Sequence, residues 1–342
     1  MTNFIHPSFK LNNNSYTKQE LLDYANTLIQ SDQAYLVDFA NLILQWFNSD
    51  DYIELTTSGT TGPPKKIQLR KEAMINSARA TGEFFNIQQG SKALLCMSTK
   101  FVGGKLMLIR ALQLGWELDV VEPCATPLQG NNKFYDFVAM VPMQVSKSIE
   151  ELRNVGTLII GGAKVNTALK EKLTTLPTKC FETYGMTETI THIAAKSIKD
   201  ECFSVLPHAS CSIDERGCLI IDAPSVTDIL IITNDVVDLL DNKHFIWKGR
   251  VDNVINSGGV KLHPEQIEEK LAKKIPYRFF VASKEDEYFG NKLILVIEHK
   301  EYDLPKDIFN ELGKYEIPKE IQFKERFIET ASGKIIRSKN II

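Results

Sequence analysis

Short apolar runs alternate with amphipathic stretches along residues 71–176, and this alternation constrains the fold more than any other feature of the chain. Four of the runs are typical of buried strands, at 94–98, 117–122, 137–142 and 157–162. Helical spacing of apolar residues predicts three helices around them, at about 71–85, 104–115 and 164–176. Strands that alternate with helices favour a largely parallel sheet with helices packed on it, so we expect a layered α/β domain.

Two further helices are predicted near the start of the chain. Thr17 and Glu20 have the spacing of a capping box. Apolar residues then recur at helical intervals over 21–29 and again over 36–47.

The last part of the chain is richer in strands. Closely spaced strands are predicted at 217–222, 228–232, 236–240 and 244–247. After Gly249 a strand-like segment turns at Ser257-Gly258-Gly259, and a helix that begins with proline covers 264–275. Strands follow near 278–282 and 292–298. We therefore expect a large α/β domain over 1–248 and a small α+β domain over 249–342.

Composition excludes several classes of protein. With 43% hydrophobic and 24% charged residues in 342, the chain has the balance of a soluble globular protein of two domains. Its net charge of -3 and scattered basic residues argue against a nucleic-acid partner. We expect neither a secretory signal nor a membrane span. Six cysteines without a C-x-x-C pair favour free thiols and a cytoplasmic location over a disulfide or metal framework.

Residues 56–65, with the sequence TTSGTTGPPK, give the strongest functional signal. Glycine lets backbone N–H groups turn inward, and hydroxyl groups with a lysine can surround a polyphosphate. The spacing is not that of a Walker A loop, because Pro64 stands where the second glycine should be. The alternative is a solvated turn. The residues expected to bind phosphate are Thr57, Ser58, Gly59, Thr60, Thr61, Gly62 and Lys65.

Residues 184–188 carry a second motif, Tyr-Gly-Met-Thr-Glu, and with the phosphate loop they resemble the AMP-forming adenylating superfamily. That superfamily includes acyl- and aryl-CoA ligases, adenylation domains of peptide synthetases and luciferases. The resemblance implies that Tyr184 stacks on adenine, Thr187 contacts the α-phosphate and Glu188 helps to hold Mg²⁺. A flat ring suits a purine face and carboxylate oxygen suits a hard cation. The resemblance also assigns Gly161 to the nucleotide site.

Three later motifs extend the resemblance to about residue 340. Thr233-Asn234-Asp235 is similar to the family's T-G-D, in which Asp235 would bind the ribose hydroxyls. Asn replaces Gly there, and Asn tolerates positive φ better than most residues. In 249–253, Gly-Arg-Val-Asp-Asn, the resemblance implies that Arg250 reaches the nucleotide and Asp252 is a hinge. The turn at Gly258 and Gly259 would let a pantetheine arm pass.

Near the C-terminus, residues 332–337 read Ser-Gly-Lys-Ile-Ile-Arg, which is similar to the family's S-G-K-I-x-R. The resemblance implies that Lys334 reaches the active site while the adenylate forms. The implied reaction joins a carboxylic acid to a thiol in two steps, with ATP and Mg²⁺ in the first step and CoA as co-substrate in the second. Fixed cations would favour displacement at the α-phosphorus. Rotation about Asp252 would then bring the glycine turn to the site.

The acid is less well defined by the motifs. Residues 102–112, VGGKLMLIRAL, and the segment 184–195 are similar to o-succinylbenzoate–CoA ligases of menaquinone synthesis. Such ligases must hold a second, unreacting carboxylate, and we expect Arg110, with Lys105, to bind it through charge-assisted hydrogen bonds. His192 is assigned to the same pocket, with a structural histidine as the alternative.

The motifs allow other interpretations of the function. The acid could be another aryl or acyl acid, and the acceptor could be the thiol of a carrier protein. A non-catalytic nucleotide-binding protein of the same fold is a further alternative. About 55 residues precede the phosphate loop, fewer than in typical relatives. The two early helices or a homodimer would then cover the face that is left.

Overall fold

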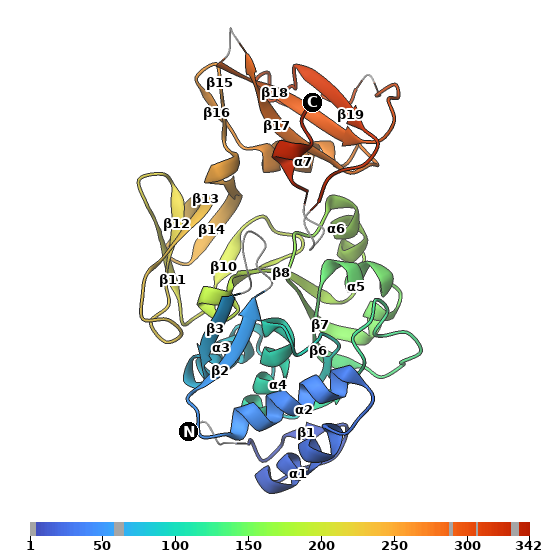
Figure 1. The fold of residues 1–342 in the computed structure, drawn as a ribbon, viewed down its shortest axis with the longest axis vertical. Coiled ribbons are helices and arrows are strands. Elements are labelled where there is room, and N and C mark those ends of the chain that lie inside the picture. The colour runs from blue at the N-terminus through green and yellow to red at the C-terminus, as the bar shows by residue number, and fades with distance from the viewer. Residues whose placement is uncertain (1–4, 58–64, 287–289, 306, 330–334) are drawn as a thin grey trace.

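The computed structural model describes residues 5–57, 65–286, 290–305, 307–329 and 335–342 (Figure 1). A sheet of twelve described strands dominates it. One half of this sheet is parallel and consists, in spatial order, of β1 (Lys10–Leu11), β5 (Glu117–Val120), β4 (Lys92–Leu95), β6 (Tyr135–Met140), β7 (Val155–Ile160) and β8 (Lys179–Gly185). The predicted parallel α/β layer is confirmed, although its four predicted strands begin up to two residues and end two or three residues earlier than expected.

The other half of the sheet is antiparallel. Its strands, in spatial order, are β9 (His192–Ser197), β10 (Phe203–Val205), β14 (His244–Arg250), β13 (Ile231–Asp241), β12 (Cys218–Asp222) and β11 (Ser210–Ile213). The prediction of separate strands at 228–232 and 236–240 is wrong, because β13 is continuous. The polar residues Asn234 and Asp235 suggested a loop, but Asp235 pairs with Arg250 across the β13–β14 ladder.

Helices cover both faces of the parallel half. One face carries α1 (Lys18–Leu28), α2 (Ala34–Phe47), α3 (Lys71–Phe85) and α4 (Val102–Leu114), and the other carries α5 (Pro142–Lys147) and α6 (Thr167–Thr174). Successive residues of one strand point to opposite faces. Leu95 therefore packs in the core beneath α3 and α4, whereas Leu94 packs in the core that includes Val145 of α5 and Leu169 of α6.

The early helices α1 and α2 pack on the large sheet. Thr17 accepts a hydrogen bond from the backbone of Glu20, whose carboxylate accepts one from Thr17 N, so the predicted capping box is confirmed. Leu21 of α1 and Trp46 of α2 belong to the main hydrophobic core. Two short helices therefore cover one face of the large sheet.

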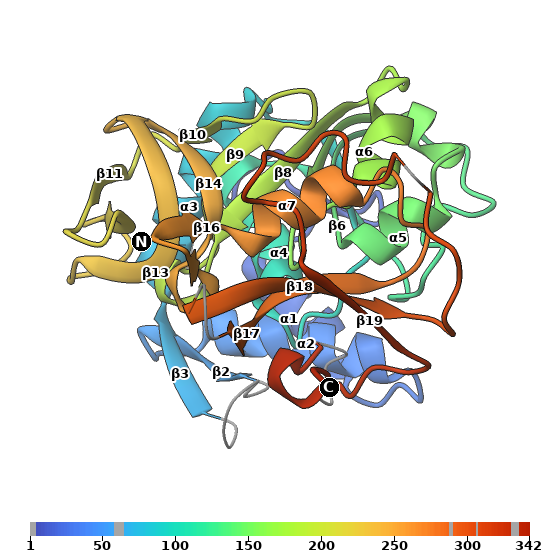
Figure 2. The same cartoon turned by 90° about the horizontal axis from the view of Figure 1, so that it is seen from above.

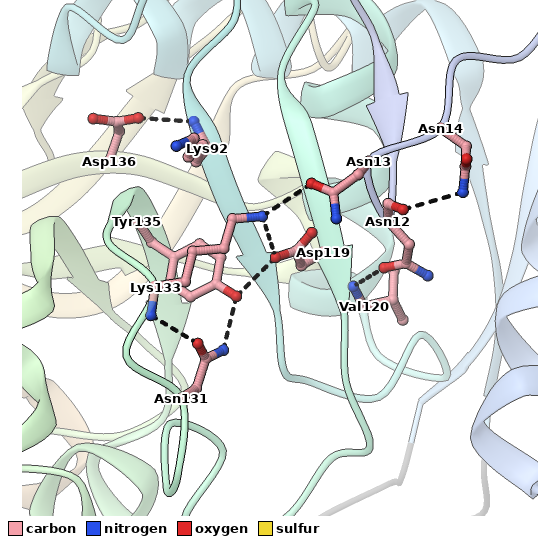
Figure 3. Close-up of polar contacts among 10 residues, drawn as sticks. All are labelled: Asn12, Asn13, Asn14, Lys92, Asp119, Val120, Asn131, Lys133, Tyr135 and Asp136. Carbon is pink, nitrogen blue, oxygen red and sulfur yellow. Dashed lines mark hydrogen bonds and ion pairs between the residues drawn. The ribbon is translucent and has the colours of Figure 1, made fainter.

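Polar side chains close the edge of the sheet beside β1 (Figure 3). Asn12 Oδ1 accepts a hydrogen bond from Val120 N at 2.9 Å, in the position where a longer β1 would offer a carbonyl oxygen. One strand inward, Asp119 binds Lys133 Nζ at 2.6 Å and the hydroxyl of Tyr135 at 2.8 Å. The edge strand is thereby only two residues long, which limits pairing with another chain.

The C-terminal part forms its own core beyond the large sheet (Figures 1 and 2). Its elements are β15 (Ile255–Ser257), β16 (Val260–Leu262), α7 (Pro264–Leu271), β17 (Phe279–Asp286), β18 (Gly290–Glu298) and β19 (Glu320–Lys324). The large sheet ends at Arg250 and the second core begins at Ile255. These positions support a domain boundary near 249–252, which we retain as a proposal.

The remaining elements are short. They are the antiparallel hairpin β2 (Tyr52–Thr57) and β3 (Lys65–Arg70), and the 3-10 turns η1 (Glu151–Asn154), η2 (Thr187–Thr189), η3 (Val251–Asn253) and η4 (Arg337–Lys339). Within the described part of the chain, no helix is both long and apolar enough to cross a membrane.

Candidate active site

A cavity of about 710 Å³ opens at the carboxyl ends of the parallel strands. Its walls come from the carboxyl ends of β6, β7 and β8, from residues that follow β4, β5, β6, β7 and β8, and from α4. Ligands of open α/β sheets bind at this edge, because loops there converge while the strands stay rigid. Gly161, Thr187, Arg110 and His192, all predicted site residues, line the cavity.

Arg110 is the most unusual side chain of the cavity. It lies on α4 with 1% of its surface exposed, and its Nε and Nη2 atoms have no partner in the described structure. Nη1 meets only the sulfur of Met107, at 3.6 Å. Burial lowers the pKa of the guanidinium to about 9, so it stays charged at neutral pH. A buried cation without a counterion is costly, and an anionic ligand would remove that cost.

Lys105 is placed differently from Arg110. It is buried on the same helix but is not among the residues that line the cavity. Burial lowers the pKa of its ammonium group, and Asp38 of α2 opposes that shift. The geometry therefore supports Arg110 more than Lys105 as the group that meets a ligand.

A second cluster gathers the residues expected around adenosine. Asp235 Oδ2 accepts a hydrogen bond from the Tyr184 hydroxyl at 2.7 Å, and its Oδ1 accepts one from Trp247 Nε1 at 3.1 Å. Burial, together with Asp235, raises the pKa of Tyr184, so the phenol stays protonated and can donate. Arg250 stands opposite Asp235 on the neighbouring strand. The ring of Tyr184, the carboxylate of Asp235 and the residue Arg250 thus lie close together.

Asn234 does not occupy a left-handed turn. It lies inside β13 and is absent from the described non-glycine residues with positive φ, so the expectation of a special backbone there is wrong. Its side chain instead accepts from Arg216 at 3.1 Å and donates to Asp252 at 3.4 Å. Arg250 also binds Asp252, at 2.9 Å. The polar substitution ties the predicted hinge residue to β13.

The loop after Tyr184 is tightly built. A Cβ on Gly185 would lie 2.3 Å from the carbonyl oxygen of Thr191, so only glycine fits there. Ile190 has a φ of 65°, and Thr191 N donates to Thr189 O at 2.7 Å, which closes a strained γ-turn. Strained turns persist where surrounding contacts fix them. This turn sets Thr187 and Ile190 in the cavity wall.

A family model for AMP-binding enzymes matches residues 40–225, which is more than half of the chain. The chain belongs to the AMP-binding enzyme family. The predicted resemblance to the adenylating superfamily is thereby confirmed.

Several relatives of this AMP-binding enzyme are known. A 2-succinylbenzoate–CoA ligase of Staphylococcus aureus (strain Newman) is 24% identical over 344 aligned residues, which cover 88% of this chain and 69% of the relative. A solved acyl-CoA synthetase (AMP-forming)/AMP-acid ligase II-like protein from Dyadobacter fermentans is 34% identical, with a TM-score of 0.64. That match covers 95% of this chain and 97% of the other.

The o-succinylbenzoate coenzyme A synthetase of Bacillus subtilis, solved with ATP and a magnesium ion, shares the fold. Its TM-score is 0.71 at 19% identity, over 84% of this chain and 69% of the other. The predicted enzyme class, an AMP-forming acid–thiol ligase, is that of the family and of these relatives.

Magnesium chemistry is compatible with the residues of this AMP-binding enzyme. The described residues contain no group of three or more His, Cys, Asp or Glu side chains that could hold a metal. Mg²⁺ is usually bound by one or two carboxylates together with substrate phosphates and water. Glu188 fits that pattern, because it is exposed beside Thr187, which lines the cavity.

Some predicted site residues lie outside the described part of the chain or away from the cavity. Ser58, Gly59, Thr60, Thr61, Gly62 and Lys334 lie outside the described residues. Thr57 ends β2 and pairs with Lys65 at the start of β3, so the hairpin brackets the predicted phosphate loop. Gly258 and Gly259 form the turn of the β15–β16 hairpin, which Figure 1 places at the end of the C-terminal unit that points away from the large sheet.

Three residues that sequence reasoning missed support the site. Trp247 holds Asp235, Thr189 closes the loop after Tyr184, and Thr81 on α3 contacts His192. None belongs to a motif whose spacing identifies it. Trp247 stands two residues before the Gly249 motif, and this position was its one sequence signal. Its contact with Asp235 could be predicted only if the pairing of β13 with β14 was known.

Proposed function

We propose that this enzyme ligates o-succinylbenzoate to CoA through an acyl-adenylate, at the expense of ATP. The observation that carries the proposal is Arg110, a fully buried guanidinium that lines the cavity with two nitrogen atoms unpartnered. An acid with a single carboxylate would present only the reacting group to the phosphate. A diacid supplies a second carboxylate for Arg110, and a bidentate pair of this kind is strong and directional. The resemblance in 102–112 and the succinylbenzoate relatives point the same way.

In the proposed first step, a carboxylate oxygen of the acid attacks the α-phosphorus of ATP. The bond from that phosphorus to the bridging oxygen breaks, and pyrophosphate leaves. Tyr184 and Asp235 would hold the adenosine, while Thr187 and Lys334 would stabilise the charge that develops on the α-phosphate. Mg²⁺, held in part by Glu188, would supply further positive charge to the phosphates.

In the proposed second step, the deprotonated sulfur of CoA attacks the acyl carbon and AMP leaves. Rotation about Asp252 would carry the C-terminal domain to an orientation in which Gly258 and Gly259 face the cavity. The β15–β16 turn points away from the large sheet in this structure, so the second step requires such a movement. A hinge of a few residues at the end of a strand can absorb it.

A release assay for pyrophosphate tests the proposal. The enzyme would be supplied with ATP, Mg²⁺ and a panel of aryl and acyl acids, with and without CoA. We expect o-succinylbenzoate to give the fastest release and a CoA thioester as product. A different best acid would overturn the substrate assignment alone. Product formed only with a carrier protein would overturn the role of CoA, and absence of release with every acid would overturn the reaction class.

A further inference from the structure

A group of polar side chains lies around His192, at the end of the cavity marked by Arg110. His192 starts β9, lines the cavity and is 5% exposed. Its Nε2 lies 3.4 Å from the hydroxyl of Thr81 on α3. Ser77 Oγ and both ring nitrogens of His208 are buried without partners in the described structure. Ser77 and His208 are not among the residues that line the cavity, so His192 is the member of this group that a ligand in the cavity can meet.

The hydrogen bonds fix the tautomer of His192. Thr81 donates its only hydroxyl proton to the carbonyl oxygen of Ser77, at 2.9 Å. Toward His192, the Thr81 oxygen can therefore act only as an acceptor, so Nε2 carries the ring proton. The ring edge with Nδ1 is then the one left for the cavity, and in a neutral ring Nδ1 offers a lone pair.

The described titratable groups that act on His192 are basic, and of these only Arg110 is charged at pH 7. Arg110 faces it from α4 and His208 from the segment between β10 and β11, while Phe85 of α3 meets the ring edge-on. No described carboxylate is among the groups that act on it. Burial first, and then Arg110 and His208, hold the pKa of His192 well below 6.5. The ring is therefore neutral in the free enzyme at pH 7.

We propose that His192 is a specificity residue that takes up one proton when the cavity binds the unreacting carboxylate. The proton comes from solvent and goes to Nδ1, so that imidazolium and guanidinium hold the carboxylate together. This inference rests on the proposed function only in that Arg110 receives a carboxylate.

The physical reason is electrostatic. A carboxylate placed against the Nδ1 lone pair would be repelled, whereas the same carboxylate beside an imidazolium gains a charge-assisted hydrogen bond. In a cavity shielded from water, an anion within hydrogen-bond distance favours the charged form of histidine. The ligand therefore raises a pKa that the empty site keeps low.

Isothermal titration calorimetry tests the proposal. The enzyme would be titrated with o-succinylbenzoate at pH 7 without ATP, in buffers that differ in ionisation enthalpy. We expect uptake of about one proton per ligand, because one group changes protonation. Affinity should fall by about tenfold per pH unit between the free and bound pKa values of His192. The monocarboxylate analogue that lacks the unreacting carboxylate should bind without proton uptake.

Two variants separate this role from a structural one. His192→Gln should bind the diacid more weakly and with no proton uptake. Thr81→Val removes the acceptor that fixes the tautomer, so Nδ1 can carry the proton of a neutral ring. Thr81→Val should therefore still bind the diacid, but with proton uptake well below one. A merely structural Thr81 would lower stability, measured as Tm, and leave proton uptake unchanged.

The outcomes also separate this inference from the proposed function. Tight binding of the diacid by the wild-type enzyme without proton uptake overturns the role of His192 and leaves the substrate assignment standing. Wild-type uptake that persists in His192→Gln also overturns it. Failure of the wild-type enzyme to bind o-succinylbenzoate overturns both.

Discussion

Asp235 shows how one residue depends on neighbours that no motif contains. Its two carboxylate oxygens are oriented by Tyr184 and Trp247 before any nucleotide binds. Sequence comparison identifies Asp235 and Tyr184 because they stand at fixed places in motifs. Trp247 became recognisable only from the pairing of β13 with β14, since that pairing brings residues twelve positions apart into contact.

We predict that Trp247→Phe weakens the binding of ATP. The substitution keeps the aromatic ring but removes the N–H that donates to Asp235, so the carboxylate is less well oriented for the ribose. The KM for ATP should rise about five- to tenfold, which corresponds to about 1–1.4 kcal/mol and lies within the net contribution of one typical hydrogen bond, with little change in kcat. Initial rates of pyrophosphate release at varied ATP measure this. An unchanged KM in a variant of normal Tm would show that Trp247 does not position Asp235.

At the scale of elements, the sequence predicted one long helix to the residue but divided one long strand. The helix at 71–85 is observed within those limits, because its apolar spacing and its proline-free interior act locally. By contrast, β13 was divided into two strands, because the polar pair at 234 and 235 breaks the apolar pattern. Those side chains are satisfied by partners on other strands, and such contacts cannot be read from a single segment.

We predict that Gly185→Ala strongly destabilises the enzyme. The new Cβ would meet the backbone of Thr191 and His192 at 2.3–2.4 Å, which the β8–β9 pairing cannot accommodate. The loss should exceed about 2 kcal/mol, typical of overpacking against backbone. Gly90→Ala is the matched control, since its Cβ would meet no atom within 4 Å and costs only the strain of a positive φ. Equal loss of stability in both variants, measured in urea, would contradict the steric explanation.

One carboxylate of helix α7 binds two lysines of the large domain. Glu269 binds Lys164 at 3.0 Å and Lys170 at 3.2 Å. Burial raises the pKa of Glu269, but the two lysines outweigh that effect and lower it to about 2. A lowered pKa means that this contact is fully present above the ordinary carboxylate pKa and is lost as pH falls toward about 2. The pairs are partly exposed, so salt should also weaken them.

We predict that Glu269→Lys loosens the contact between α7 and the large domain. Trypsin should then cleave after Arg250 about two- to fivefold faster, the effect of one partly exposed ion pair. Adding Lys164→Glu and Lys170→Glu should restore the slower rate, because the charges are then exchanged. Glu311→Lys is the control, since Glu311 pairs with Lys273 inside the C-terminal unit. If Glu311→Lys accelerates cleavage equally, the Glu269 contact is not what holds the helix.

At the scale of the whole molecule, the order of motifs predicted the family and its α/β fold, and both are confirmed. What the sequence could not show is how the early elements join the large domain. In the structure, α1 and α2 pack on the main core, and Asn12 binds Val120 at the sheet edge. The bond between Asn12 and Val120 joins residues about a hundred positions apart, so a local sequence pattern cannot predict it. The two-domain division remains a proposal that the separate cores support.

The central claim is that the cavity selects a diacid because the buried guanidinium of Arg110 binds the second carboxylate. The most direct test compares kcat/KM of the wild-type enzyme and Arg110→Met for o-succinylbenzoate and for the analogue that keeps only the reacting carboxylate. We predict that Arg110→Met lowers kcat/KM for the diacid by about 100-fold, as expected when a buried charged pair loses one partner. The reactive monocarboxylate analogue should change by less than about threefold, since it makes no contact that Arg110→Met removes. Equal losses for the diacid and the analogue, or no loss for either, would contradict the account.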